Sequence, residues 1–202
     1  QHWHDHRMRT SGVVLAAGSS RRMGRTKQLL PLGASTLLGT VLATARSSRL
    51  DELVLVLGAE AEVIAAAVDT TGLRVVVAAD HAEGMGASLR AGVGALGPEV
   101  ERVAVLLGDQ PRVTAELVDA VLDRHLESGL PAAAVSAGGV LQPPVVVDRR
   151  LWPELLAAHG DSGLRSVLRA VPGKVATLLV EGVTVDVDTP DDYRHMLTTE
   201  ER

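Results

Sequence analysis

The sequence predicts an α/β fold: a single three-layer α/β/α domain in which a mostly parallel sheet lies between two layers of helices. Short β-branched runs alternate with longer segments rich in Ala and Leu, which is typical of repeated strand–helix units. The chain has 202 residues and is 46% hydrophobic, which suits one compact core. No internal repeat or low-complexity linker separates a second domain, so we expect one domain over residues 11–202.

The first half of the chain contains four predicted strand–helix units. We expect the strands at four β-branched runs, which are Gly12–Ala17, Glu52–Leu57, Leu73–Ala78 and Arg102–Leu107. The helices between and after them are expected at Ser35–Ser47, Ala61–Val68, Ala87–Leu96 and Thr114–Glu127. In the last helix, Leu117, Val121 and Leu122 recur at helical spacing.

After Pro131 the pattern changes to shorter strands with glycine-containing turns. Strands are expected at Ala132–Ser136, Leu141–Val147, Val175–Val180 and Val183–Val187, with turns at Gly138-Gly139 and Glu181-Gly182. Helices are expected at Leu151–Ala158, at Ser162–Ala170 and from Pro190 to about Met196, because proline suits the first turn of a helix. We expect the later strands to be antiparallel additions to the main sheet.

The composition excludes several classes of function. Twenty basic and twenty-five acidic residues give a formal charge of −5, without the basic run that nucleic-acid binding requires. The chain has no cysteine, so disulfides, thiolate metal sites and a cysteine nucleophile are excluded. The apolar runs are far shorter than the ~20 residues of a membrane span. We therefore expect a cytoplasmic protein with neither nucleic acid nor a membrane as partner.

The first ten residues are polar and lack the apolar core of a signal peptide. We expect residues 1–10 to be a flexible leader. His2, His4 and His6 alternate within it, and a disordered tail is favoured there over a metal site.

A basic loop follows the first predicted strand. Leu15-Ala-Ala-Gly18 leads into a segment with four cations that ends at Lys27. Backbone N–H groups and positive side chains in such a loop can converge on a polyphosphate, although a basic surface loop is the alternative. Lys27 is one of two lysines beside eighteen arginines, which indicates a need for a compact point charge rather than a guanidinium fork.

Carboxylates follow two other predicted strands. Asp109 lies in Gly108-Asp109-Gln110-Pro111, where a carboxylate at a strand's end can hold Mg²⁺, or can cap the next turn. In Val185–Pro190, alternation places Asp186 and Asp188 on one face of a strand. Asp188 could instead be the N-cap of the helix that opens at Pro190, and Asp186 could be an exposed edge residue.

The basic loop and the carboxylates together predict phosphoryl transfer. The loop would hold a triphosphate while one or two Mg²⁺ ions neutralise the charge at the reacting phosphorus. A phosphate monoester acceptor is largely anionic at pH 7, so no general base is required. In agreement, no histidine falls in these motifs, and His81, His125, His159 and His195 are expected on the surface or on helix faces.

The segment Leu15-Ala-Ala-Gly18-x-Ser20-x-Arg22-Met23-Gly24-x-x-Lys27 resembles the signature of the GT-A-like nucleotidyltransferases, which have a Rossmann-like sheet. Within that superfamily it is most similar to molybdenum-cofactor cytidylyltransferases and related guanylyltransferases. Asp80-x-x-x-Gly84-Met-Gly86-x-Ser88-Leu-Arg90-Ala-Gly92 resembles the segment that closes over the nucleotide, and Gly160–Arg165 one near the acceptor pocket. The resemblance covers about Gly12 to Met196.

The resemblance implies roles for individual residues. It implies a nucleotide site formed by Leu15, Ala16, Ala17, Gly18, Arg22, Lys27, Asp80, Gly84, Ser88 and Asp109. It also implies that Lys27, Arg22 and Asp109 are catalytic, and that Asp109 and Asp188 bind Mg²⁺. The implied substrates are an NTP, CTP ahead of GTP, and a phosphorylated pterin-type acceptor, with a molybdenum hydroxylase or its maturation factors as further partners.

One segment departs from the pattern of these families. Relatives commonly carry a Gly-His-Pro-like turn where this chain has Gln142-Pro143-Pro144-Val145. Because this turn is expected beside the acceptor, the acceptor's identity stays open. A transferase acting on a terpenoid precursor, a phospholactate or a sugar phosphate is one alternative, and a carrier that binds cofactor without chemistry is another.

Overall fold

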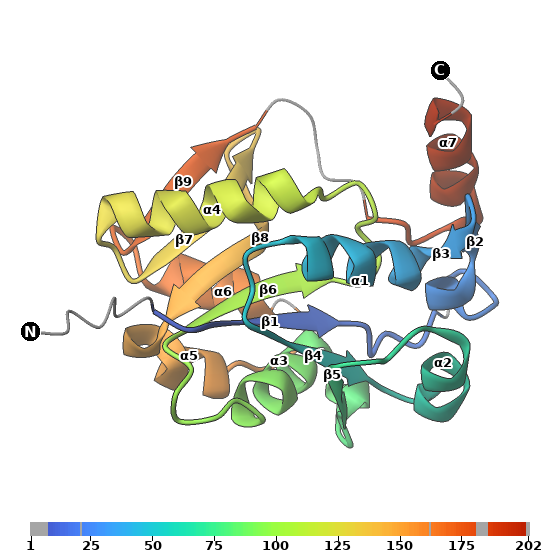
Figure 1. Cartoon of the computed structure of the whole chain (residues 1–202), viewed down its shortest axis with the longest axis horizontal. Helices are drawn as coiled ribbons and strands as arrows, with labels where there is room; N and C mark the ends of the chain where they lie inside the picture. The colour runs from blue at the N-terminus through green and yellow to red at the C-terminus, as the bar shows by residue number, and fades with distance from the viewer. Residues whose placement is uncertain (1–7, 21, 162, 181–185, 201–202) are drawn as a thin grey trace, which may run out of the picture.

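A seven-stranded sheet forms the centre of the computed structural model, which describes residues 8–20, 22–161, 163–180 and 186–200. The strands, in their order across the sheet, are β5 (Leu73–Val77), β4 (Glu52–Leu57), β1 (Thr10–Leu15), β6 (Arg102–Leu107), β8 (Val140–Asp148), β7 (Ala132–Ala137) and β9 (Val175–Leu179). Helices cover both faces (Figure 1), which confirms the predicted three-layer α/β/α architecture.

The strand directions confirm a mostly parallel sheet with an antiparallel addition. β1 pairs in parallel with β4 and β6, and β4 pairs in parallel with β5. β8 is antiparallel to both of its neighbours, β6 and β7, whereas β7 and β9 are parallel to each other. Among the described strands of this sheet, β8 alone therefore runs against the rest.

The helices separate onto two faces because successive residues of a strand point to opposite sides. On β1, Val13 and Leu15 pack in one hydrophobic cluster and Val14 packs in the other. The first cluster includes side chains of α3 (Met85–Gly94), α5 (Trp152–Leu156) and α6 (Gly163–Ala170); the second includes those of α1 (Leu37–Ser47), α2 (Ala61–Ala67) and α4 (Ala115–Ser128). Each fully buried aliphatic side chain contributes about 1.5–3 kcal/mol of burial free energy.

A third, smaller cluster fixes the C-terminal helix beside the basic loop. Met23 of the loop packs with Val187 and with Met196 of α7 (Pro190–Glu200). Leu32 of β2 (Pro31–Leu32), the strand that pairs with β3 (Ser35–Thr36), belongs to the same cluster. Residues from opposite ends of the chain are thereby held together, as Figure 1 shows where α7 lies against β2 and β3.

Several predicted boundaries shift for identifiable reasons. β4 and β6 have the predicted bounds, but β1 begins at Thr10, whose backbone N–H donates to Asp51 Oδ2 at 2.8 Å. The strand therefore includes the last residue of the predicted leader, whose first seven residues lie outside the described ones. The helix predicted from Ser35 begins at Leu37, because Ser35 and Thr36 form β3 and the Thr36 side chain accepts from the Gly39 N–H.

The strand predicted at Val183–Val187 is not found in its described part. Residues 183–185 lie outside the described residues, and neither Asp186 nor Val187 belongs to a strand. The Val187 N–H instead donates to the Asp109 carbonyl at 3.0 Å, a single contact outside any ladder. The alternation of valines and aspartates therefore reflects one buried residue, Val187, between two aspartates of the site described below, rather than a pleated strand.

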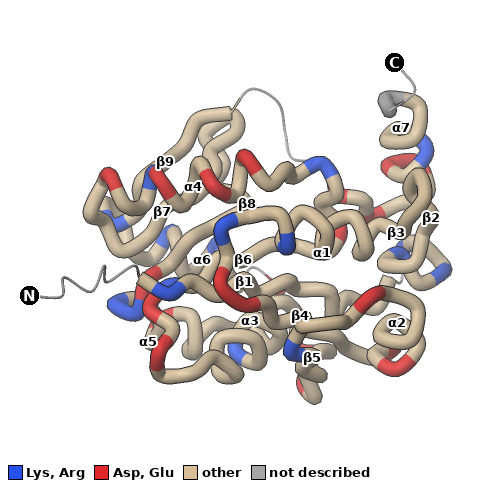
Figure 2. The backbone as a smooth tube through the Cα atoms, in the orientation of Figure 1, with Lys and Arg blue, Asp and Glu red and all other residues tan. Residues whose placement is uncertain are grey.

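Charged residues of both signs are interspersed along the chain (Figure 2). None of the helices in the described ranges has both the length and the apolar character that crossing a membrane requires.

Candidate active site

Two adjoining cavities lie at the carboxyl ends of β1 and β6. The larger cavity has a volume of about 650 Å³ and the smaller cavity about 550 Å³. They share six lining residues, which are Arg22, Met85, Leu107, Asp161, Asp186 and Asp188. Strand ends of an open α/β sheet are where ligands are expected, and here two compartments meet along one edge.

The basic loop curves around the larger cavity and is braced from inside. Gln28 is buried, and its Nε2 donates to the carbonyls of Ala16 and Gly18, at 3.0 Å each. Ser20 Oγ donates to Gln28 Oε1 at 3.1 Å and accepts from the Lys27 N–H at 3.0 Å. These bonds fix the small-residue turn after β1 and the start of the short 3₁₀ helix η1 (Lys27–Leu29), so Lys27 projects from a rigid base.

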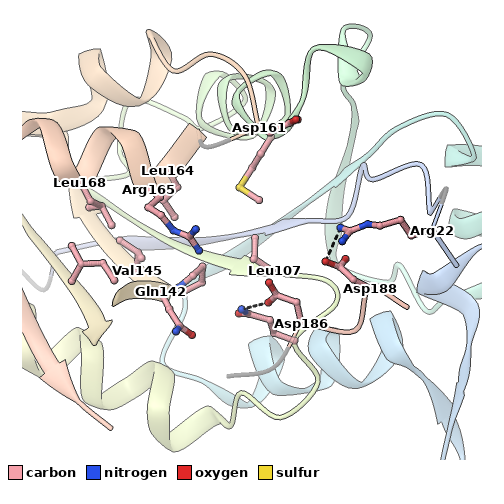
Figure 3. A pocket seen from close by; sticks show the side chains of 14 residues that line it. Arg22, Leu107, Gln142, Val145, Asp161, Leu164, Arg165, Leu168, Asp186 and Asp188 are labelled. Atoms are coloured by element: carbon pink, nitrogen blue, oxygen red, sulfur yellow. Dashed lines mark hydrogen bonds and ion pairs between the residues drawn. The ribbon is translucent and has the colours of Figure 1, made fainter. Parts of the chain in front are cut away.

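Lys27 joins the two predicted metal ligands. Its Nζ lies 2.5 Å from Asp109 Oδ2 and 2.9 Å from Asp188 Oδ1, and its side chain is only 12% exposed. Arg22 Nη2 lies 2.7 Å from Asp188 Oδ2 (Figure 3). Burial opposes the charge on Lys27, but the two carboxylates outweigh it and raise the pKa of the ammonium. For Asp188, burial acts against ionisation, yet Lys27 and Arg22 together lower its pKa.

Asp188 is available to this cluster because another residue caps α7. Thr189 Oγ1 accepts from the Asp192 N–H at 3.2 Å, and Asp192 Oδ2 accepts from the Thr189 N–H at 2.8 Å. This reciprocal pair is a capping box, so Asp188 is not the N-cap. The capping alternative is therefore wrong for Asp188.

Asp186 lies on the boundary between the cavities. Its Oδ1 accepts from Gln110 Nε2 at 2.6 Å, a contact drawn in Figure 3. Burial first, and then the charge of Asp109, raise the pKa of Asp186. Asp186 is exposed, as one alternative expected, but it belongs to no strand and lines both cavities.

The donor set fits a hard divalent cation at Asp109 and Asp188. Both carboxylates reach a single cation, the Lys27 ammonium, so their oxygens converge on one position. Mg²⁺ and similar ions take one or two protein carboxylates and complete their shell with water and phosphate oxygens. Among the residues that the structure describes, no group of three or more His, Asp or Glu side chains forms a complete protein cage for a metal. The residues present thus suit an ion that arrives with phosphates.

Glycines allow two segments to pack closely where the two cavities meet. Gly84, at φ +98°, precedes α3, and a Cβ there would lie 2.3 Å from Asp161 Oδ1. The Gly86 N–H donates to the Gly160 carbonyl at 2.9 Å, and a Cβ on Gly86 would lie 2.8 Å from the His159 backbone. Only glycine permits this approach, which seats the segment before α6 on the start of α3.

The smaller cavity has apolar walls, and Arg165 points into it. β8 contributes Leu141 and Val145, and α6 contributes Leu164 and Leu168. Figure 3 shows Arg165 extending from α6 toward the middle of the cavity. Gln142 and Pro143, from the segment that departs from the family pattern, also line this cavity and lie within β8 rather than in a turn. In the register of β8 with β7, Ala134 pairs with Val145 and Val135 with Gln142, so β8 carries two residues more than β7 at this irregularity.

Most of the predicted site residues are brought together. The larger cavity is lined by Leu15, Ala16, Ala17, Gly18, Arg22, Lys27, Gly84, Ser88, Asp109 and Asp188. Asp80 is not among the lining residues. It is exposed at the start of the 3₁₀ helix η2 (His81–Glu83), and its role stays a prediction.

Sequence reasoning missed three kinds of lining residue. His81 lines the larger cavity, although no histidine was expected in the site; its place beside Asp80 in the Asp80–Gly92 segment was the available signal. Gln28 supports the loop from a position just beyond the motif. Asp161 and Arg165 fall in the Gly160–Arg165 segment, which the resemblance placed near the acceptor without assigning either side chain. His125 is also not at the surface: it is 2% exposed, on the buried side of α4.

The fold, the cation-bearing loop and the paired carboxylates define an α/β protein built to handle nucleotide phosphates at the end of a parallel sheet. Residues 12–175 match the MobA-like NTP transferase domain, and the chain belongs to this family of nucleotidyltransferases.

Two relatives align over nearly the whole chain. It is 34% identical to nicotine blue oxidoreductase of Paenarthrobacter nicotinovorans, covering 93% of this chain and 96% of the relative, and 33% identical to the purine catabolism protein PucB of Bacillus subtilis, covering 90% and 93%. The molybdenum cofactor cytidylyltransferase of Escherichia coli is 24% identical, covering 94% and 95%.

Solved structures agree with the fold. Rv0371c of Mycobacterium tuberculosis superposes with a TM-score of 0.85 at 34% identity, covering 95% of this chain and 98% of that one. A manganese complex of Rv0371c superposes with a TM-score of 0.82 at 33% identity, covering 95% and 100%.

Proposed function

We propose that this protein is a cytoplasmic, Mg²⁺-dependent enzyme that transfers CMP from CTP, in preference to GMP from GTP, to a molybdopterin-type phosphate and releases pyrophosphate. The observation that carries the proposal is the meeting of two cavities along Arg22, Asp186 and Asp188. A transferase needs its two substrates on either side of the reacting phosphorus, and this arrangement supplies two compartments with charged groups at their boundary.

The larger cavity suits the NTP. Gly18, Arg22 and Lys27 offer backbone and cationic groups to the triphosphate. Gly84 and Ser88, at the start of α3, line the same cavity and would contact the nucleoside. The smaller cavity suits the acceptor, because its leucine and valine walls accommodate a flat ring while Arg165 faces an anionic group.

In the proposed reaction, an oxygen of the acceptor's phosphate attacks the α-phosphorus of the NTP in line. A new P–O bond forms as the bond to the bridging oxygen of the β-phosphate breaks, and pyrophosphate leaves with that electron pair. The attacking phosphate is already anionic, since its second pKa is about 6, so no side chain has to remove a proton. Arg22 and Lys27 offset the charge of the phosphates. A divalent ion at Asp109 and Asp188 would supply further charge neutralisation.

The likeness to the E. coli molybdenum cofactor cytidylyltransferase supports this choice of substrates. A product of this kind would serve a molybdenum hydroxylase, so such an enzyme or its maturation factors are proposed partners. The 34% identity to a protein named nicotine blue oxidoreductase favours a second candidate, transfer of hydride from NADH or NADPH to a conjugated ring in the smaller cavity, with a proton from water completing the reduction. The same experiment separates the two.

The test measures pyrophosphate release with CTP, GTP, ATP and UTP in turn, with Mg²⁺, in the presence and absence of molybdenum cofactor. Parallel reactions follow NADH and NADPH oxidation with nicotine blue. We expect cofactor-dependent release that is fastest with CTP. Release only with a terpenoid, phospholactate or sugar phosphate acceptor would change the assigned acceptor but keep the nucleotidyl-transfer reaction. Nucleotide binding without release from any acceptor would favour a carrier, and dye reduction would favour the second candidate.

A further inference from the structure

Lys27 occupies the position between the two carboxylates that would hold a divalent ion. Its ammonium bonds Asp109 Oδ2 at 2.5 Å and Asp188 Oδ1 at 2.9 Å. We propose that Lys27 is the resident cation of this metal site, which a divalent ion must displace, so that the ion binds well only when a triphosphate takes over the ammonium. The proposal rests on the proposed function in one respect, the assignment of Asp109 and Asp188 as metal ligands.

The carboxylates need a cation whenever the metal is absent. Asp109 and Asp188 lie close to a third carboxylate, Asp186, and like charges at short range repel one another. The Lys27 side chain is nearly buried, and its ammonium pairs with the carboxylates of both Asp109 and Asp188. Arg22 holds the remaining oxygen of Asp188, so both oxygens of that carboxylate already carry a charged hydrogen bond.

Displacing the ammonium is costly without nucleotide and favourable with it. The described residues that line the larger cavity offer Lys27 no carboxylate to replace Asp109 and Asp188 other than Asp186 and Asp161, and Asp186 is already bonded to Gln110. A bound triphosphate would add several anionic oxygens to the same cavity. Lysine suits such an exchange, because its ammonium is compact and its stem flexible, whereas the backbone of Lys27 is anchored to Ser20. Nucleotide and metal would then each promote the binding of the other.

The test measures Mn²⁺ binding by the loss of the free-ion EPR signal, with no nucleotide or acceptor present. We expect Lys27→Met to bind Mn²⁺ at least about tenfold more tightly than the unaltered protein, because two charge-assisted hydrogen bonds no longer have to be broken. Arg25→Met is the matched control. Arg25 is an exposed cation of the same loop, stacked over the Tyr193 ring at 5.9 Å, and it pairs with neither carboxylate in the described contacts.

Three outcomes would overturn the proposal. The first is Mn²⁺ affinity in Lys27→Met within about twofold of the unaltered protein. The second is equal tightening in Arg25→Met, which would reflect net charge alone. The third is a gain that persists in the double variant Lys27→Met with Asp109→Asn, which should lose it, because a persisting gain would place the ion elsewhere. Thermal melts check folding, and Lys27→Gln replaces Lys27→Met if the latter does not fold.

Failure of this proposal and failure of the proposed function give different results. If pyrophosphate release is absent with every acceptor but Lys27→Met tightens Mn²⁺ binding, the cation exchange stands and the transferase assignment falls. If release is normal and Mn²⁺ affinity is unchanged in Lys27→Met, the transferase assignment stands and the exchange falls.

Discussion

The larger and smaller cavities share an edge but are built in different ways. The larger cavity is formed by the small and charged residues that follow β1 and β6, together with the start of α3 and the carboxylates Asp161, Asp186 and Asp188. The smaller cavity is walled by aliphatic side chains of β8 and α6, with Arg165 as its inward cation. Phosphates can be recognised by a short contiguous loop, whereas a ring has to be enclosed by side chains from distant segments. A phosphate site of the first kind can therefore be recognised in the sequence as a motif. A ring site of the second kind has no contiguous motif.

The two cavities are nevertheless held in fixed relation. The Gly84–Asp161 contact and the Gly86–Gly160 hydrogen bond seat the segment before α6 on the start of α3. Val187, between Asp186 and Asp188, bonds the carbonyl of Asp109. Changes at the shared edge should consequently affect the reaction as a whole, while changes on one wall should affect one substrate.

Asp109→Asn tests the shared chemistry and has the largest expected effect. Loss of the carboxylate removes a metal ligand and one partner of Lys27, so kcat should fall by about 10³-fold or more. Steady-state kinetics of pyrophosphate release provide the measurement. Asp191→Asn, at an exposed site in the first turn of α7, is the control. Turnover within about threefold of the unaltered enzyme would remove Asp109 from the metal site.

Lys27→Arg tests the larger cavity alone. The guanidinium keeps the charge but is too large for the position between Asp109 and Asp188, so kcat/KM for the nucleotide should fall by about 10–100-fold. The same assay with varied nucleotide measures this. Lys174→Arg, at the other lysine of the chain, is exposed and should leave the kinetics unchanged. Unchanged kinetics in Lys27→Arg would return this lysine to the basic-surface-loop interpretation.

Arg165→Met tests the smaller cavity alone. Without its inward cation the cavity should bind the anionic acceptor less well, raising the acceptor KM by about tenfold while the nucleotide KM stays constant. Arg169→Met lies one turn further along α6, outside the residues lining the smaller cavity, and should have no effect. A rise in the nucleotide KM instead would show that the two compartments are not separate.

His125→Gln lies outside both cavities and should affect stability rather than kinetics. Burial, together with the charge of Arg102, lowers the pKa of His125, and Asp148 offsets only part of this. The folded chain therefore favours the neutral imidazole. Below the usual histidine pKa of about 6.5 the unfolded chain takes up a proton first, so this stability is complete above that pH and is lost as the pH falls.

Melting temperatures at pH 7.5 and at pH 5.5 measure this contribution. His125→Gln should reduce the loss of Tm on acidification, whereas His195→Gln, at an exposed position of α7, should retain it. Equal losses in the two variants would contradict the assignment. A change in kcat at neutral pH in His125→Gln would show that a substitution at the end of the sheet opposite the cavities affects the reaction.

Local sequence patterns were enough to predict those features of the structure that depend on residues adjacent in the sequence. The β-branched runs identify β4 and β6 to the residue, and the contiguous glycines and cations from Gly18 to Lys27 predict a loop that binds phosphate. The same reasoning failed where a tertiary contact competes with a local one. Asp188 has a good position for capping α7, yet Thr189 and Asp192 cap it and Asp188 turns to Lys27.

By itself, then, the sequence determined the α/β layering, the basic loop and the identity of Asp109 and Asp188 as carboxylates at the sheet's edge, since hydrophobic period and contiguous motifs are local properties. The tertiary structure alone decided that Lys27 joins Asp109 to Asp188, that Asp161 reaches across to Gly84, and that two cavities meet there. Those relations join residues more than 70 positions apart, and only packing of the complete chain brings such residues into contact.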